Sequence, residues 1–183
     1  MSTINIAGMS GSLRRGSYNT ALLRAAQFLL PADTKLEIIE YNDVPLFNHD
    51  VEKATGFPEP VEAMRSQLAH ADAVLFAAPE YNWSIPGVMK NAIDWASRGP
   101  HSPIARKPAA IMGAGGRLGS ANAQQHLRQI LTSTDMHVVN RPSVLVSGAS
   151  EHFDDDLNLT SDRYRTQIQK LLHALVDEVE LRA

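Results

Sequence analysis

The stretch from Gly8 to Thr20, GMSGSLRRGSYNT, is crowded with hydroxyl groups and carries two arginines. It follows a short apolar run and precedes a helix-like run, so it joins an expected strand to an expected helix. Backbone N–H groups at a helix start favour an anion, and an arginine grips phosphate through two nitrogens. With Ser10, Ser12, Arg14, Ser17 and Asn19, the stretch therefore indicates a phosphate cradle for a mononucleotide. Taken alone, it is equally compatible with a polar loop in which Ser17 or Asn19 merely caps the helix.

Standard nucleotide-loop templates do not fit this stretch. A dinucleotide fingerprint needs G-x-G-x-x-G, whereas the glycines here stand at Gly8, Gly11 and Gly16. A phosphate-binding loop of the Walker type needs a Gly-Lys-Ser or Gly-Lys-Thr ending, which is also missing. These mismatches argue against a Rossmann dehydrogenase.

Two further loops carry residues suited to a ligand. The stretch PEYNWSIPG, Pro79 to Gly87, offers the Tyr81–Asn82 backbone to the polar edge of a planar ring. Tyr81 and Trp83 could stack on that ring or shield it. The stretch GAGGRLGS, Gly113 to Ser120, offers glycines that let the backbone approach a ligand closely. The alternatives are a connection whose aromatic side chains simply pack, and a flexible glycine-rich connection.

The elements that position these loops alternate between strand-like and helix-like runs. We expect strands over 4–9, 35–41, 72–79, 107–113 and 137–148, the last interrupted at Pro142. We expect helices over 18–30, 60–71, 86–97, 120–134 and 160–181, with Ser120 capping the fourth. Such alternation predicts a five-stranded, doubly wound parallel sheet with helices on both faces. Ligands of such sheets sit at the carboxyl ends of the strands, which selects the loops over 9–17, 79–86 and 113–119.

Composition excludes several classes of function. The 183 residues suit one domain spanning 1–183, and a net charge of -3 gives no reason to expect nucleic acid or a membrane as partner. The chain has no cysteine, which removes disulfides and thiolate chemistry, and its seven histidines show no metal-ligand spacing. We therefore expect no metal. Because no secretory signal or membrane-length apolar run is present, we expect a cytoplasmic protein.

Four stretches together resemble the NADPH-dependent FMN reductase family, a flavodoxin-like group that includes quinone, chromate and azo-dye reductases. They are GSLRRGSYN (11–19), PLFNHDVEKATGFP (45–58), PEYNWSIPGVMKNAIDWASR (79–98) and HLRQIL (126–131). The resemblance implies a flavodoxin-like fold and non-covalent FMN. By position it assigns cofactor contacts to Ser12, Arg14, Ser17, Tyr18, Asn19, Pro79, Glu80, Tyr81, Asn82, Gly113, Gly115, Gly116 and Arg117. Relatives often have serines where this chain has Gly113 and Ala114.

The resemblance also implies an activity. NAD(P)H, either NADPH or NADH, gives a hydride to FMN, and a quinone, azo, flavin or metal-oxyanion acceptor then takes two electrons in a ping-pong cycle. Because the flavin supplies the chemistry, no side chain is assigned as catalytic. Backbone donors near Tyr81–Asn82 and Gly115–Gly116 would stabilise charge on the ring. The alternative is a flavodoxin-like electron carrier without NAD(P)H turnover.

The family usually forms homodimers, or homotetramers built from them. The expected helix over 86–97 has Val88, Ala92, Ile93 and Trp95 spread widely around its surface. This pattern suits a helix covered partly by its own sheet and partly by a partner. The alternative is complete burial within one chain.

Overall fold

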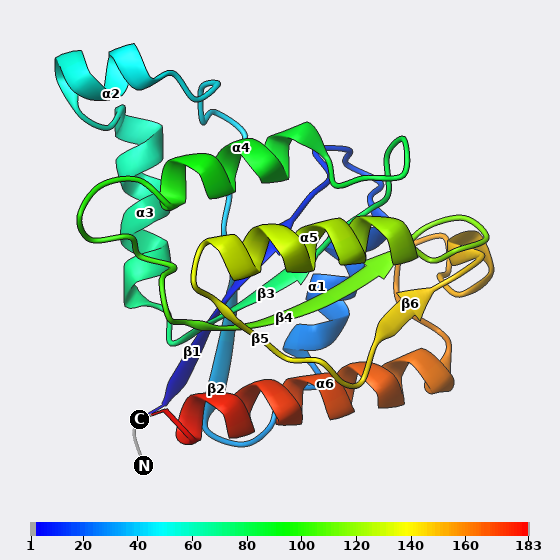
Figure 1. The fold of residues 1–183 in the computed structure, drawn as a ribbon. Coiled ribbons are helices and arrows are strands. Elements are labelled where there is room, and N and C mark those ends of the chain that lie inside the picture. Colours follow the sequence, from blue (N-terminus) through cyan, green and yellow to red (C-terminus); the bar gives the residue numbers. More distant parts are fainter. Residues whose placement is uncertain (1–2, 183) are drawn as a thin grey trace.

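A parallel sheet forms the centre of the molecule, in a computed structural model that describes residues 3–182 (Figure 1). The strands are β1 (Ile4–Ser10), β2 (Thr34–Ile38), β3 (Ala73–Ala77), β4 (Pro108–Ala114), β5 (His137–Val138) and β6 (Val144–Val146). Their order is β2-β1-β3-β4-β5, and β6 also pairs with β4. Strand order reverses between β1 and β3, because the chain places β2 on one side of β1 and β3 on the other. The flavodoxin-like sheet expected from the sequence is therefore confirmed.

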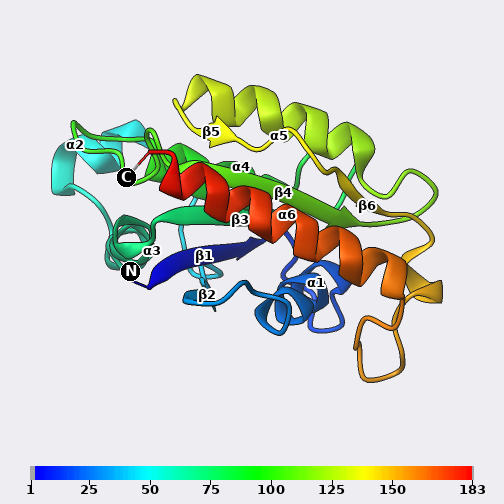
Figure 2. The same ribbon diagram turned by 90° about the horizontal axis from the view of Figure 1, so that it is seen from below.

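Helices cover both faces of the sheet. They are α1 (Tyr18–Gln27), α2 (His49–Thr55), α3 (Glu59–His70), α4 (Gly87–Ala96), α5 (Ala121–Ser133) and α6 (Asp162–Glu180), with a 3-10 turn, η1 (Ala149–Glu151). Helices α1 and α6 pack on one face, and α3, α4 and α5 pack on the other (Figure 2). One apolar cluster lies between the sheet and each of these two groups of helices. Strand β3 lies between the two clusters and is buried at every residue, as its unbroken apolar sequence predicts.

The register of the sheet brings the loops together. Ser10 at the end of β1 pairs with Ala77 at the end of β3, and Ala77 pairs with Met112 near the end of β4. The Gly11 N–H then donates to the Ala77 carbonyl at 2.9 Å, which carries β1 one step beyond its last residue. The loops after β1, β3 and β4 therefore start side by side.

Two elements differ from the sequence-based expectation. The strand expected over 137–148 is split into β5 and β6, with Pro142 in the break; proline has no N–H to give to a sheet. Helix α2 was not expected at all. It buries none of its residues, so it shows no apolar periodicity, and Figure 1 shows it standing away from the sheet.

Two further details of the helices also differ. Ser120 occupies the N-cap position of α5, but its side chain makes no capping bond, because its backbone is left-handed with a φ of 71°. In α4 the side chains of Ala92, Ile93 and Trp95 are all buried within this chain, and only Val88 is half-buried. The pattern around α4 is thus accounted for without a partner.

Among residues 3–182, no helix is long and apolar enough to cross a bilayer.

Candidate functional site

A cavity of about 380 Å³ opens where β1, β3 and β4 end. Its walls come from all three loops that the sequence selects and from one segment that it does not, η1 with the residue before it. The lining residues are Ser12, Arg14, Ser17, Tyr18, Asn19, Pro79, Glu80, Tyr81, Ala114, Gly115, Gly116, Gly148, Ala149 and Ser150. Most of the residues expected at a cofactor site therefore share one cavity at the switch point of the sheet, where ligands of such sheets bind.

The loop before α1 presents backbone donors. Ser17 is the N-cap, and its Oγ accepts from the Thr20 N–H at 3.2 Å, so the capping role considered for it is real. Within residues 3–182, no protein oxygen accepts from the N–H groups of Gly16, Ser17, Tyr18 or Asn19. Unclaimed N–H groups at a helix start form a site for an anion.

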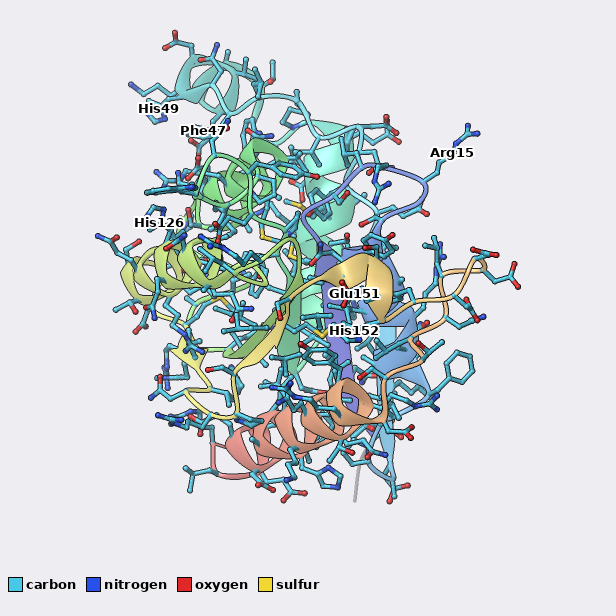
Figure 3. All side chains as sticks on the ribbon, turned by 90° about the vertical axis from the view of Figure 1, so that its right-hand side faces the viewer. Arg15, Phe47, His49, His126, Glu151 and His152 are labelled. Atoms are coloured by element: carbon cyan, nitrogen blue, oxygen red, sulfur yellow. The ribbon has the colours of Figure 1, made fainter. Side chains whose placement is uncertain are left out.

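Arg14 adds a positive charge beside these donors. It lines the cavity, and its guanidinium carbon lies 5.6 Å from the centre of the Tyr18 ring. None of the three ion pairs among residues 3–182 involves Arg14. Arg15 does not line the cavity and extends away from the molecule (Figure 3).

Asn19 joins two walls of the cavity. Its Nδ2 donates to the Ala114 carbonyl at 2.9 Å, and its Oδ1 accepts from the Ala114 N–H at 3.0 Å. The side chain is only 4% exposed. Both polar atoms are therefore used to tie the start of α1 to the end of β4.

Glu80 is held at the other wall by α5. Its Oε2 accepts from the Asn122 and Ala123 N–H groups at 2.8 and 3.1 Å, and its Oε1 accepts from Asn122 Nδ2 at 3.0 Å. Burial raises the pKa of the Glu80 carboxyl, but these hydrogen bonds outweigh it and the pKa is lowered overall. The carboxylate thus caps α5, which explains why Ser120 need not.

Residues 81–84 form a tight two-residue hairpin at the cavity rim. The Tyr81 N–H donates to the Ser84 carbonyl and the Ser84 N–H to the Tyr81 carbonyl, both at 3.0 Å. Between them, Asn82 and Trp83 have φ of 50° and 64°. The Tyr81 hydroxyl reaches across to Ser12 Oγ at 3.5 Å. Asn82 does not line the cavity, although within residues 3–182 no acceptor takes its N–H.

The third loop is bonded to the segment that sequence reasoning missed. The Gly148 and Ala149 N–H groups donate to the carbonyls of Gly116 and Gly115, each at 3.0 Å, and the Gly115 N–H donates to Val146. Gly115 and Tyr81 therefore have no free N–H for a ligand, contrary to expectation, whereas Gly116 and Asn82 do. The segment 148–150 follows the last strand at its carboxyl end, and that position was the signal for it.

Gly113 and Arg117 do not line the cavity. Gly113 is buried within β4, where an added Cβ would lie 2.0 Å from Ser120 Oγ and 2.4 Å from the Ala78 carbonyl oxygen. The glycine is thus required by the packing of α5 on the sheet. Arg117 is exposed in the loop beyond the cavity.

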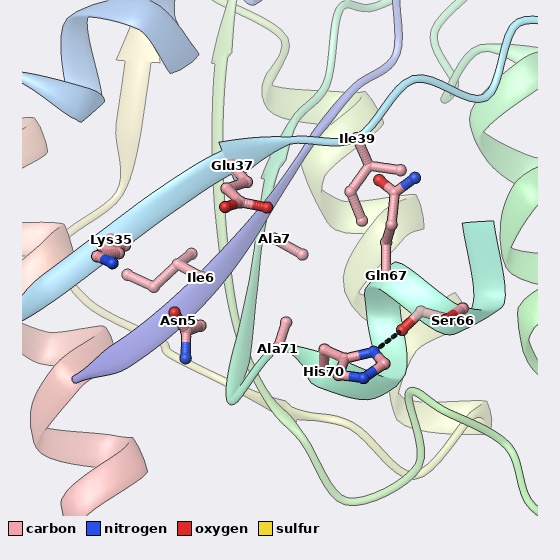
Figure 4. A pocket seen from close by; sticks show the side chains of 10 residues that line it. All are labelled: Asn5, Ile6, Ala7, Lys35, Glu37, Ile39, Ser66, Gln67, His70 and Ala71. Atoms are coloured by element: carbon pink, nitrogen blue, oxygen red, sulfur yellow. Dashed lines mark hydrogen bonds between the residues drawn. The ribbon is translucent and has the colours of Figure 1, made fainter. Parts of the chain in front are cut away.

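A second cavity of about 380 Å³ lies between β2 and α3 (Figure 4). It is lined by Asn5 and Ala71, which adjoin the amino ends of β1 and β3, and by Lys35, Glu37 and His70 among others. The His70 ring is bonded to its own helix at the Ser66 carbonyl, 2.7 Å away. This cavity is away from the switch point. Nowhere in residues 3–182 do three or more histidine or carboxylate side chains gather as a metal site.

Comparisons with known proteins agree with this geometry. A sequence model of the family described as NADPH-dependent FMN reductase matches residues 4–151. An NAD(P)H-dependent FMN reductase of Pseudomonas aeruginosa is 51% identical over 94% of this chain and 93% of its own length. An NAD(P)H:quinone oxidoreductase of Solanum tuberosum is 41% identical over 94% of this chain and 91% of its own.

The fold comparison points the same way. The solved structure of a flavoenzyme NAD(P)H:(acceptor) oxidoreductase from Paracoccus denitrificans superposes with a TM-score of 0.87 and 33% sequence identity. The match covers 97% of this chain and 98% of that one. Similarity therefore extends over nearly the whole chain, including all four walls of the cavity.

Proposed function

Because this chain belongs to the NADPH-dependent FMN reductase family, we propose that it passes two electrons from NAD(P)H through non-covalently bound FMN to a small acceptor. One observation carries the proposal within this molecule. The N-terminus of α1 presents unclaimed N–H groups and Arg14 to a cavity at the switch point of the sheet. That donor set fits one phosphate monoester, such as the phosphate of FMN.

The β1–α1 loop would hold the phosphate and the ribityl chain. The N–H groups of residues 16–19 and the Arg14 guanidinium supply donors, and Ser17 Oγ still has its own proton to donate while it accepts from Thr20. Ser12 and Tyr18, which also line the cavity, lie along the same wall. Apart from Arg14, the side chains along this wall are polar and uncharged, so Arg14 supplies the full positive charge that faces the phosphate.

The opposite wall would hold the ring. FMN, when bound, supplies the redox chemistry, because it accepts a hydride from NAD(P)H and passes two electrons on. The loop at Pro79–Tyr81 and the loop at Gly115–Gly116, which both line the cavity, would hold the ring between them. The free N–H groups of Asn82 and Gly116 are the donors that remain for its polar edge. Reduction of a quinone takes up one proton beyond the hydride; water supplies it, and no side chain is assigned that role.

Quinones are the acceptors we favour, because several relatives are named as quinone oxidoreductases. Azo compounds, free flavins and metal oxyanions would react at the same exposed ring.

We also propose a cytoplasmic location and a homodimer or homotetramer. The large, exposed side chains of Leu46 (83%) and Trp83 (76%) are available to such an interface. Sedimentation of the purified protein tests the assembly.

The test of the function uses the purified protein. We expect it to be yellow, to release FMN on denaturation, and to reduce a benzoquinone with NADPH or NADH with parallel lines in double-reciprocal plots. FMN binding without turnover would indicate an electron carrier instead. Protein that neither holds nor takes up FMN would refute the proposal.

A further inference from the structure

Glu80 and α5 hold the hairpin at the cavity rim in place. The Glu80 carboxylate accepts three hydrogen bonds from the first turn of α5, two of them from backbone N–H groups. Glu80 and Asn122 lie 42 residues apart in sequence. The hairpin at residues 81–84 begins at the residue directly after Glu80, so these bonds fix its starting point.

Helix α5 has no local cap that would replace Glu80. The Ser120 side chain is turned toward β4, where it fills the space beside Gly113, and its Oγ lies 3.4 Å from Gln124 Nε2. The first N–H groups of a helix need acceptors, and a negative charge there is also favoured by the helix dipole. The Glu80 carboxylate meets both needs.

A second contact holds the other end of the hairpin. His126, one turn along α5, places its Nδ1 3.0 Å from Ser84 Oγ. Both ends of the hairpin are therefore attached to the same helix. Figure 3 shows His126 above α5, on the side of the helix where α4 lies.

The hairpin needs such attachment because its backbone is costly. Positive φ is tolerated by asparagine but is a genuine outlier for a large aromatic residue such as Trp83. Residues in such conformations persist when their surroundings hold them there. The Trp83 side chain is mostly exposed, so packing of that side chain does not hold the turn.

We propose that Glu80 is a positioning residue that fixes the Tyr81–Ser84 hairpin, and with it the Asn82 N–H, to the first turn of α5. The consequence for FMN rests on the proposed function; the consequence for the hairpin does not. Without the carboxylate, the hairpin loses its fixed starting point, and the Asn82 N–H loses its position at the rim of the cavity. The cavity wall and α5 thus form one unit.

Amide hydrogen exchange of the FMN-free protein tests this directly. In Glu80→Ala we expect exchange at Tyr81, Ser84 and the first turn of α5 to speed up by about tenfold or more, as for loss of charge-assisted bonds. Amides of β3 should be unchanged. Glu80→Gln keeps one acceptor oxygen and should restore most of the protection. Asn122→Ala, which removes one bond of the three, should lie between them.

Asn48→Ala is the matched control, since Asn48 caps α2 away from the cavity through a bond to the Asp50 N–H at 2.9 Å. It should leave the hairpin amides unchanged. Unchanged hairpin exchange in Glu80→Ala would overturn the proposal. So would equal loss of protection in β3, or a Glu80→Gln protein that behaves like Glu80→Ala.

An FMN titration of the same proteins separates this proposal from the function itself. If the wild-type protein binds FMN, we expect the dissociation constant to rise about tenfold in Glu80→Ala and to stay near wild type in Asn48→Ala. If the wild-type protein binds no FMN, the proposed function fails, while the exchange experiment still decides the role of Glu80.

Discussion

At the scale of single residues, the cavity separates polar groups that support the fold from those left for a ligand. Both polar side-chain atoms of Asn19 are hydrogen-bonded to the Ala114 backbone, and the Glu80 carboxylate accepts hydrogen bonds from the start of α5. Arg14 has no carboxylate partner among the described residues, and the N–H groups at the start of α1 are unclaimed. The groups without a protein partner are the ones suited to a phosphate.

Arg14→Ala should weaken FMN binding by about 1–3 kcal/mol, the value of a lost hydrogen bond to a charged group. Titration of the FMN-free protein, followed by flavin fluorescence, measures this change. Arg15→Ala is the control, because Arg15 does not line the cavity. Equal affinity for the Arg14→Ala and Arg15→Ala proteins would remove Arg14 from the site.

Asn19→Ala should destabilise the protein even without FMN. It leaves the buried N–H and carbonyl of Ala114 unpaired, at about 1–3 kcal/mol for each group. Urea unfolding measures the loss, with Gln129→Ala at an exposed position of α5 as the control. A loss no larger than that of the control would show that water replaces the Asn19 bonds.

At the scale of elements, α5 determines much of the site. Its start packs on Gly113 of β4, its first N–H groups bind Glu80, and its second turn contacts Ser84. Helix α5 therefore contacts both the loop after β4 and the hairpin after β3. Substitutions at the start of α5 should therefore change the positions of two walls of the cavity.

Gly113→Ala should lower the free energy of unfolding by roughly 1–3 kcal/mol, because the new Cβ would overlap the Ser120 side chain and the Ala78 backbone. Adding Ser120→Gly should recover only part, since the Ala78 carbonyl remains. Gly116→Ala serves as the control because nothing lies within 4 Å of its added Cβ. Urea unfolding of the three variant proteins measures these changes in free energy. A Gly113→Ala protein as stable as the wild type would contradict the packing described.

The Glu80 contribution to stability should depend on pH. Its pKa is lowered in the folded protein, so the ionised form favours folding above the ordinary glutamate value of about 4.3 and this is lost as pH falls through the lower folded value. The difference in unfolding free energy between wild type and Glu80→Gln should therefore shrink below about pH 4. A difference that stays constant from neutral to acid pH would contradict this.

Much of this arrangement could be predicted from local sequence, but not all of it. Apolar periodicity indicated β1, β3, α4 and α6, and the strand-end rule selected three of the four cavity walls. Helix α2 lacked a signal because it buries nothing. The capping of α5 by Glu80 could not be foreseen, because it joins residues 42 apart whose meeting depends on the whole sheet. Ser120 has a suitable side chain for a cap, but its left-handed backbone prevents that role.

At the scale of the whole molecule, sheet topology and family membership lead to the same place. The order β2-β1-β3-β4-β5 puts the switch point beside β1, and the cavity lies there. Relatives named as FMN and quinone reductases match the chain over nearly its full length. The unclaimed N–H groups at the start of α1 suit an anion on physical grounds, whereas the identity of the ligand as FMN follows from the family.

The most direct test is anaerobic mixing of the FMN-loaded protein with NADPH, and separately with NADH, while the visible absorbance of the flavin is recorded. We expect rapid bleaching by at least one of the two nucleotides, with one NAD(P)H consumed per FMN, and return of the colour when a benzoquinone is added. A flavin spectrum that neither nucleotide changes would contradict it.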